Sequence, residues 1–257
     1  MPTGGQILRP DAPHPVFGRQ FEYPRGYAGH THRHRLAQLV YPLRGVVSVE
    51  TGTGTWVVTT LTAVAIPPWQ EHRVAAYGNA SLRSVFVDPD VHASLITNVE
   101  AVHVSPLLHE LIREAGDHYT DIDPEGGGIA ATVVDLIAQL LPTMPTSRRS
   151  IWLPRIEHPM LRPIEAALDD DPGDTTTVDE WARRLALSTR HFGRLFKQET
   201  GTTFSTWRSL HHVKHALVWI AQGESVSRIA ADLGYSSPSS FIEMFKRHTG
   251  CTPGASL

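Results

Sequence analysis

Short apolar segments follow one another between residues 38 and 88, and their composition predicts β-strands. Each segment is rich in Val, Thr and aromatic residues, and turns such as GTGT and YGNAS separate it from the next. The segments are QLVYPL, VVSVE, TWVVT, AVAIP, HRVAAY and LRSVFVD. Strands that recur every ~8–12 residues predict an all-β barrel or sandwich.

The hydrophobic period becomes helical after this region. In residues 105–119, SPLLHELIREAGDHY, Leu108, Leu111 and Ile112 follow the i, i+3, i+4 spacing of an amphipathic helix, and residues 128–142 repeat it. Both helices carry more apolar surface than a small barrel needs covered. We therefore expect them to cover the barrel or to pair with a second subunit, which predicts a homodimer.

The pattern predicts an α+β chain of two domains joined by a linker. Residues 1–145 form the predicted β-barrel domain with its covering and dimerisation helices, and residues 175–257 form an all-α domain. Residues 146–174 are rich in Pro, Ser and Arg, a composition typical of linkers, and contain one further helix.

The all-α domain contains a duplicated pair of short helices. Residues 181–201, WARRLALSTRHFGRLFKQETG, align with residues 229–250, IAADLGYSSPSSFIEMFKRHTG. A capping box begins at Thr177, while Ser237 and Pro238 suit the N-cap and first position of a helix in the second copy. A turn of about four residues separates the helices of each copy, so each copy predicts a helix-turn-helix unit.

The second helices of the two copies, residues 188–199 and 237–248, are predicted to recognise double-stranded DNA. Their apolar residues share one face, which leaves small and basic residues for the major groove. A connecting helix over 204–222 spans about 28 Å, close to the ~34 Å between successive major-groove faces. The candidate DNA contacts are Arg190, His191, Gly193, Arg194, Lys197, Arg208, Ser237, Ser239, Ser240, Glu243, Lys246 and Arg247.

Charge supports this division of the chain. The net charge is −3 overall, but residues 175–257 carry 10 Lys and Arg against 6 Asp and Glu, a net charge of +4. The single cysteine, Cys251, excludes an internal disulfide and a cysteine-based zinc site. No apolar run approaches the ~18 residues that span a bilayer, and no signal peptide is evident, so we expect a cytoplasmic protein without a membrane partner.

Alternating histidines precede the first predicted strand, in the segment GHTHRHRLAQLVYPLRG. His32 and His34 project from one strand face, and His72 from a distant strand completes a candidate three-histidine site, with Gln38 as a weak fourth ligand. Neutral imidazoles suit Zn, Ni or Fe. The histidines also fit a polar strand end without metal, so both interpretations remain open.

Two further groups of residues carry binding hypotheses. Without a metal, the barrel interior is still the expected small-molecule effector pocket, lined by Tyr41, Trp56 and Trp69. On the connecting helix, the i, i+4 spacing of His211 and His215 can bind metal, but we expect these histidines to lie on a solvated helix face.

The segment ADLGYSSPSSFIEMFKRHTGCTPGAS resembles the signature of the AraC/XylS family of transcription regulators, within a resemblance that covers residues 175–255. It implies a sequence-specific promoter-binding domain. Base contacts are implied for Arg190, Gly193, Arg194, Ser239, Ser240 and Glu243. Glu243 is a departure, because many relatives carry Arg or a neutral residue there and a carboxylate repels phosphate. The first recognition helix should therefore supply more affinity than the second.

The N-terminal part resembles the cupin-type sensor domains of that family. Gly26, His32, His34, Gln38 and Gly45 follow the common cupin spacing with Gln in place of Glu, and PPWQEH has Trp69 where Gly is usual. The segment that begins QLVYPL also resembles the subgroup that includes the nitroimidazole-resistance repressor NimR. That resemblance implies control of the chain's own gene and a neighbouring transporter gene.

The preferred hypothesis is a transcription regulator that is not an enzyme. A small molecule or a metal in the barrel would control promoter binding, and RNA polymerase is a further candidate partner. The alternative is a metal-dependent cupin enzyme, an oxygenase or isomerase, in which His32, His34 and His72 hold iron. A structural interaction module would leave the spacing of the duplicated helices unexplained.

Overall fold

A computed structural model describes residues 16–60, 62–90, 96–118, 128–147 and 151–255. The chain forms two compact units, and the main boundary between them lies between residues 150 and 151. In the part of the chain that the structure describes, no helix is both long enough and apolar enough to cross a membrane.

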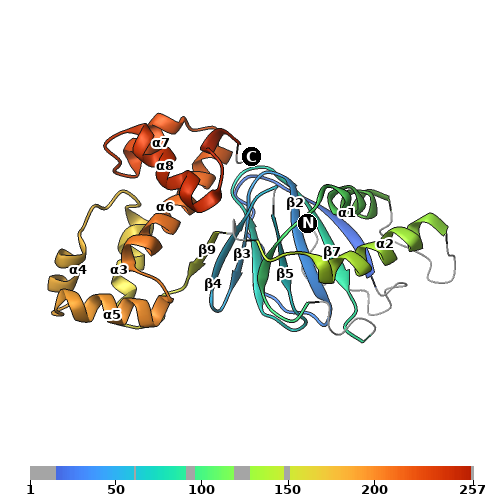
Figure 1. Cartoon of the computed structure of the whole chain (residues 1–257), viewed down its shortest axis with the longest axis horizontal. Helices are drawn as coiled ribbons and strands as arrows, with labels where there is room; N and C mark the ends of the chain where they lie inside the picture. Colours follow the sequence, from blue (N-terminus) through green and yellow to red (C-terminus); the bar gives the residue numbers. More distant parts are fainter. Residues whose placement is uncertain (1–15, 61, 91–95, 119–127, 148–150, 256–257) are drawn as a thin grey trace. The chain divides into compact units, whose positions relative to one another are not determined.

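The first unit is a sandwich of two antiparallel sheets (Figure 1). Its strands are β1 (Val16–Tyr23), β2 (Ala37–Arg44), β3 (Val47–Thr51), β4 (Gly54–Val58), β5 (Thr62–Ile66), β6 (His72–Ala76), β7 (Ala80–Val87) and β8 (Glu100–His103). One sheet has the order β1-β7-β2-β5-β8, and the other places β6, β3 and β4 side by side. The structure confirms the predicted fold class and all six predicted strands, but the sheets do not close into a barrel.

Alternation along β2 produces two separate hydrophobic layers, because successive side chains point to opposite faces of a strand. Leu39 packs toward α1 (Pro106–His118) and α2 (Gly128–Leu140), whereas Val40 packs into the space between the two sheets. Full burial of such a side chain contributes about 1.5–3 kcal/mol. The short helix η1 (Leu141–Thr143) follows α2. The two predicted amphipathic helices therefore cover one face of the sandwich.

The second unit consists of two helix-turn-helix pairs joined by one long helix. Its elements are β9 (Ile151–Pro154), α3 (Arg162–Asp170), α4 (Val178–Arg184), α5 (Thr189–Thr200), α6 (Phe204–Ala221), α7 (Val226–Asp232), α8 (Pro238–Thr249) and the short helix η2 (Pro253–Ala255). Helices α4 and α5 form one pair, α7 and α8 form the other, and α6 connects them (Figure 1).

Matched caps fix the ends of both second helices, and Ser237 takes the N-cap position that the sequence predicts. Ser188 and Ser237 each accept a hydrogen bond from the backbone N–H three residues further on. Gly201 and Gly250 end α5 and α8 with φ values of 72° and 77°, a conformation that favours glycine. The capping box at Thr177 is also present. Each recognition helix is thus held at both ends by local interactions.

The segment predicted as a linker is instead partly built into the helical unit. Ile164 and Leu168 of α3 are fully buried in the same hydrophobic cluster as Phe192 and Trp207. The indole Nε1 of Trp207 donates to the carbonyl of Pro154 at 2.9 Å. The helix predicted within this segment is present as α3, and the C-terminal unit begins near residue 151 rather than 175.

Candidate effector site and nucleic-acid interface

The three histidines predicted to form one site lie together in the first unit. His32 and His72 form a β-bridge in which each backbone N–H donates to the carbonyl of the other at 2.9 Å. Their ring centroids are 4.5 Å apart, and the His34 ring lies 5.1 Å from that of His72. One ring nitrogen from each residue lies within 4.8 Å of the others. A single ion can therefore be reached from all three side chains.

Backbone carbonyls orient the three imidazole rings in the same way. The Nδ1 atoms of His32, His34 and His72 lie 2.9, 2.7 and 2.8 Å from the carbonyl oxygens of residues 30, 36 and 70, respectively. An Nδ1–H that donates to a carbonyl leaves Nε2 as the free electron-pair donor. Metal-bound histidines commonly have this arrangement, because the outer hydrogen bond fixes the tautomer and the ring orientation.

His72 supplies an electron pair that the described part of the chain leaves unused. Its Nε2 is buried and has no hydrogen-bond partner among the described residues. Burial lowers the pKa of His72 to about 4 and also lowers the pKa of His34. Both rings are therefore neutral near pH 7, which is the form that binds metal ions. A buried nitrogen without a partner costs about 1–3 kcal/mol, which a bound ion or ligand atom would offset.

Gln38 adds an oxygen to the same site. Its Nε2 donates to Ser84 Oγ at 2.9 Å, and its Oε1 lies 3.1 Å from His34 Nε2. When the Nδ1–H of His34 donates to Leu36, the His34 lone pair faces this oxygen, and a cation between the two acceptors would satisfy both. Three imidazole nitrogens and one amide oxygen form a neutral donor set that suits a divalent ion such as Zn²⁺, Ni²⁺ or Fe²⁺.

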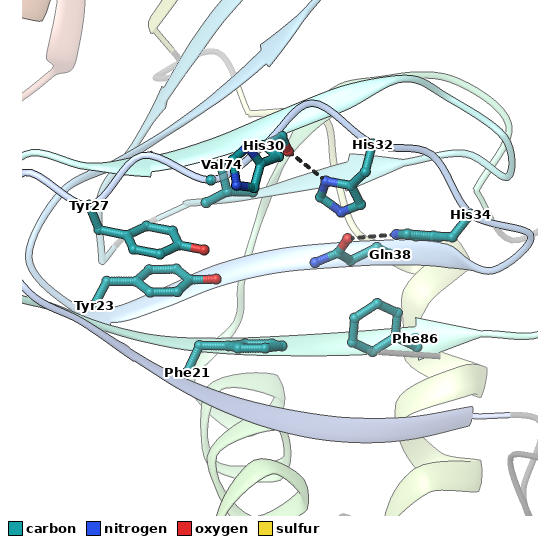
Figure 2. A pocket seen from close by; sticks show the side chains of 10 residues that line it. Phe21, Tyr23, Tyr27, His30, His32, His34, Gln38, Val74 and Phe86 are labelled. Atoms are coloured by element: carbon teal, nitrogen blue, oxygen red, sulfur yellow. Dashed lines mark hydrogen bonds between the residues drawn. The ribbon is translucent and has the colours of Figure 1, made fainter. Parts of the chain in front are cut away.

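An aromatic cavity opens beside the histidines (Figure 2). Phe21, Tyr23 and Tyr27 lie toward one end, while His32, His34 and Gln38 lie toward the other. The rings of Tyr23 and Tyr27 are stacked, with centroids 4.0 Å apart, and burial raises the pKa of Tyr23 far above its usual range. The lining residues are Phe21, Tyr23, Tyr27, Gly29, His30, His32, His34, Gln38, Val74 and Phe86, none of which is Asp, Glu, Lys or Arg.

The aromatic residues predicted to line the pocket do not line this cavity. Tyr41 faces the helices: its hydroxyl donates to the Thr60 carbonyl at 3.0 Å and lies 2.8 Å from His109 Nδ1. Trp56 packs against the hydrophobic layer between the sheets. Trp69 is 61% exposed and has a φ of 61°, at the position where the cupin pattern usually has Gly.

Strand β1 supplies two pocket residues, Phe21 and Tyr23, that were not predicted from the sequence. Phe21 and Tyr23 alternate with polar residues along VFGRQFEY, which is a strand signal. The antiparallel register places Phe17 of β1 opposite Phe86 of β7, and their rings stack at 5.2 Å. The alternation was available in the sequence, but the long-range pairing that selects Phe86 was not.

The basic side chains of α5 form one exposed face. Phe192 and Phe196 are fully buried, whereas Arg190, Arg194 and Lys197 are exposed. None of these three cations forms an ion pair with another residue in the described ranges. His191 and Gly193 are exposed on the same helix. This face is free to approach a polyanion.

Helix α8 exposes fewer basic groups toward its beginning. Ser239, Glu243, Lys246 and Arg247 are exposed, which agrees with their predicted outward positions. Ser237 and Ser240 are half-buried, because Ser237 caps the helix and the Ser240 hydroxyl donates to the Ser237 carbonyl at 2.8 Å.

Arg208 of α6 is committed to contacts within the helical unit. Its Nη1 donates to the Thr176 carbonyl at 3.0 Å, and its guanidinium lies over the Phe204 ring. Arg208 is half-buried, and its predicted contact with DNA stays a prediction.

These features define a DNA-binding regulator that carries a ligand-binding domain. The AraC-like ligand binding domain model matches residues 14–151, and the model of a helix-turn-helix domain matches residues 181–257. The chain belongs to the AraC family of transcriptional regulators, with an N-terminal ligand-binding domain and a C-terminal helix-turn-helix domain.

Similar proteins include other regulators. The HTH-type transcriptional regulator NimR of Escherichia coli K12 is 31% identical over 87% of this chain and 80% of its own length. The RCS-specific HTH-type transcriptional activator RclR of the same organism is 26% identical over 93% of this chain and 89% of its own. A crystal structure of ToxT from Vibrio cholerae covers 93% of this chain and 97% of its own, at 9% identity and a TM-score of 0.40.

The buried His72 predicts a pH dependence of stability. Because the pKa of His72 is lowered in the folded state, the unfolded state takes up the proton first as the pH falls below about 6.5. The free energy of unfolding therefore decreases from about pH 6.5 and the decrease is complete near pH 4. Between pH 8 and pH 5, metal-free wild type should lose about 2 kcal/mol more unfolding free energy than His72→Gln. Urea unfolding at the two pH values measures this difference. A His103→Gln control, altered at an exposed position of β8, should follow the wild type; equal losses in all three proteins would contradict the assignment.

Proposed function

We propose that His32, His34 and His72 hold a divalent metal ion, and that occupancy of the adjoining cavity by an effector controls promoter binding through α5 and α8. The observation that carries the metal proposal is the convergence of three carbonyl-oriented imidazoles on one point, with the Nε2 of His72 buried and unpaired. The ion would supply a positive charge and an open coordination position at the end of the cavity.

The chemistry of the cavity indicates the class of effector. Tyr23, Tyr27 and Phe86 offer ring faces and edges, and an aromatic pair contributes about 0.5–1.5 kcal/mol beyond the area that it buries. Because the lining side chains include no carboxylate, the charge of a bound divalent ion would be balanced best by the ligand itself. We therefore propose a small planar aromatic effector with an anionic or electron-pair-donating group that completes the metal coordination.

Binding is favoured over turnover at this site. The compared relatives are named as transcriptional regulators, and no Asp or Glu lines the cavity as a further acid or base beside the histidines. Glu50 of β3 forms an ion pair with Arg73 of β6, which leaves this carboxylate committed to a cross-strand contact. We propose that the protein is a regulator without catalytic activity.

Dimer formation is proposed to use α1 and α2. These helices cover the sandwich with their buried faces, yet Leu107 and Ile129 remain 55% and 76% exposed at their N-terminal ends. A second copy of the chain would bury both residues.

The metal site is tested by metal content. Full-length protein loaded with Zn²⁺ and desalted should contain one equivalent more than His72→Gln, because the variant lacks one of three imidazole ligands. The His103→Gln control should retain the wild-type content. Elemental analysis measures the content, and circular dichroism checks that the variants are folded. Identical content in wild type and folded His72→Gln would refute the proposed site.

The DNA interface is tested with Arg194→Ala. If Arg194 contacts a base edge, this change should weaken specific binding by about 1–3 kcal/mol. The control is Arg228→Ala on α7, because Arg228 faces Glu224 and Asp232 and should leave affinity unchanged. Footprinting and fluorescence anisotropy on fragments upstream of the chain's own gene and a neighbouring transporter gene provide the measurement, at one fixed salt concentration. Equal affinities of the two variants would contradict the assignment of Arg194 to a base contact.

The proposed dimer is tested with Ile129→Glu, which places a charge on the exposed apolar position of α2. Wild type should sediment as a dimer and Ile129→Glu as a monomer or a much weaker dimer, because a buried unpaired carboxylate is strongly unfavourable. An Asp135→Asn variant on the same helix serves as a mild control. A wild-type monomer in analytical ultracentrifugation would contradict the proposal.

A further inference from the structure

A second group of metal-ligating side chains lies within the helical unit. His211 and His215 are one turn apart on α6, with ring centroids 4.5 Å apart, and Asp169 approaches them from the end of α3. The Nε2 atoms of His211 and His215 lie 2.9 and 4.0 Å from Asp169 Oδ1. The ligand atoms of all three residues lie within 4.8 Å of one another.

His211 and His215 were expected on a solvated face of the connecting helix. The structure contradicts this expectation. The side chain of His211 is 0% exposed and that of His215 is 18% exposed, and the Asp169 carboxylate at the end of α3 lies beside both rings. His215 Nε2, which faces Asp169, is buried without a hydrogen-bond partner among the described residues. The hydrogen bond between Asp169 and His211 therefore leaves part of the cluster unexplained.

Protonation and access both suit a cation. Burial lowers the pKa of His215 to about 3 and also lowers the pKa of His211, so both imidazoles are neutral near pH 7. The hydrogen bond from His211 lowers the pKa of Asp169, which is therefore ionised. The Asp169 side chain is 52% exposed, so an ion can reach the carboxylate from solvent and keep water in its remaining positions.

We infer that Asp169, His211 and His215 form a second metal site, for Zn²⁺ or a similar divalent transition-metal ion. Two histidines at i, i+4 on a helix are a recurrent zinc-binding arrangement, and one carboxylate is a common third ligand. Zinc–ligand bonds of about 2.0–2.2 Å place ligand atoms roughly 3.3 Å apart in a tetrahedral site. The Nε2–Oδ1 distances of 2.9 and 4.0 Å lie on either side of that separation.

Occupancy of this site would clamp α3 to α6. Because α6 connects the two helix-turn-helix pairs, the ion would stabilise the helical unit and restrict its fluctuations. Lys214 would compete with the ion for the Asp169 carboxylate, because its Nζ lies 3.6 Å from Asp169 Oδ1 and its side chain is 21% exposed. The ammonium group partly neutralises Asp169 when no metal is bound and must move away when the ion binds. This inference is independent of the three-histidine site.

The test uses full-length protein in which His32→Gln and His72→Gln together disable the N-terminal site. Titration with Co²⁺, followed by its visible absorption, should show one equivalent bound, and Zn²⁺ should displace it. Adding Asp169→Asn or His215→Gln should weaken Co²⁺ binding by at least about tenfold, because each removes a ligand. His191→Gln, at an exposed position of α5, should leave the affinity unchanged.

Lys214→Gln provides a test in the opposite direction. Removal of the competing ammonium group should tighten Co²⁺ binding severalfold. The change leaves all three proposed ligands in place. Thermal unfolding followed by circular dichroism should show that Zn²⁺ raises the Tm of the double-variant background but not that of the Asp169→Asn protein. A folded background protein that binds no Co²⁺, or equal affinity in the background, Asp169→Asn and Lys214→Gln proteins, would overturn the inference.

Discussion

Removal of imidazole rings from water is the physical constraint on which the chemistry of this protein depends. In a buried position the neutral ring is favoured over the cation, and the lowered pKa values of His72 and His215 follow from this. A neutral ring retains an electron pair, and that pair must be satisfied by a donor or by an ion. The Nε2 atoms of His72 and His215 lie close to other ligand atoms and lack a protein donor among the described residues, and the two proposed metal sites rest on this arrangement.

In the helical unit, buried side chains and helix caps determine which residues are exposed on the surface. Aromatic residues such as Phe196 and Phe245 fill the two hydrophobic faces, and hydroxyl caps and left-handed glycines set where α5 and α8 begin and end. These interactions fix which residues must point outward. On α5 they leave Arg190, Arg194 and Lys197 exposed without competing carboxylates among the described residues, whereas α8 exposes Glu243 as well. The two helices therefore share the same packing and caps, and they differ in the charges that they expose.

Periodicity was sufficient to predict most elements, and it failed where long-range contacts decide the outcome. The six strands from β2 to β7 and the duplicated helices follow from local apolar spacing and cap residues. The spacing of His32, His34 and His72 also predicted that they would meet. By contrast, the aromatic end of the cavity depends on the pairing of β1 with β7, and the cluster on α6 depends on the approach of Asp169 from α3. Neither packing relationship is encoded in a local pattern.

The ligand set of the three-histidine site contains no carboxylate, and this couples metal binding to effector binding in the proposed regulator. Gln38 stands where the cupin pattern usually has Glu, so the donor groups would leave the charge of a divalent ion uncompensated in a half-buried, aromatic environment. An anionic effector would contribute more binding free energy to such an ion than to an ion that already has a protein carboxylate as a ligand. The electrostatic interaction also strengthens as the local dielectric constant falls. Thermodynamic linkage then requires the reciprocal effect, so that the effector tightens metal binding by the factor by which the metal tightens effector binding. In the proposed regulator, the substitution of Gln for Glu thus weakens the site for metal alone and makes its occupancy depend on both ligands together.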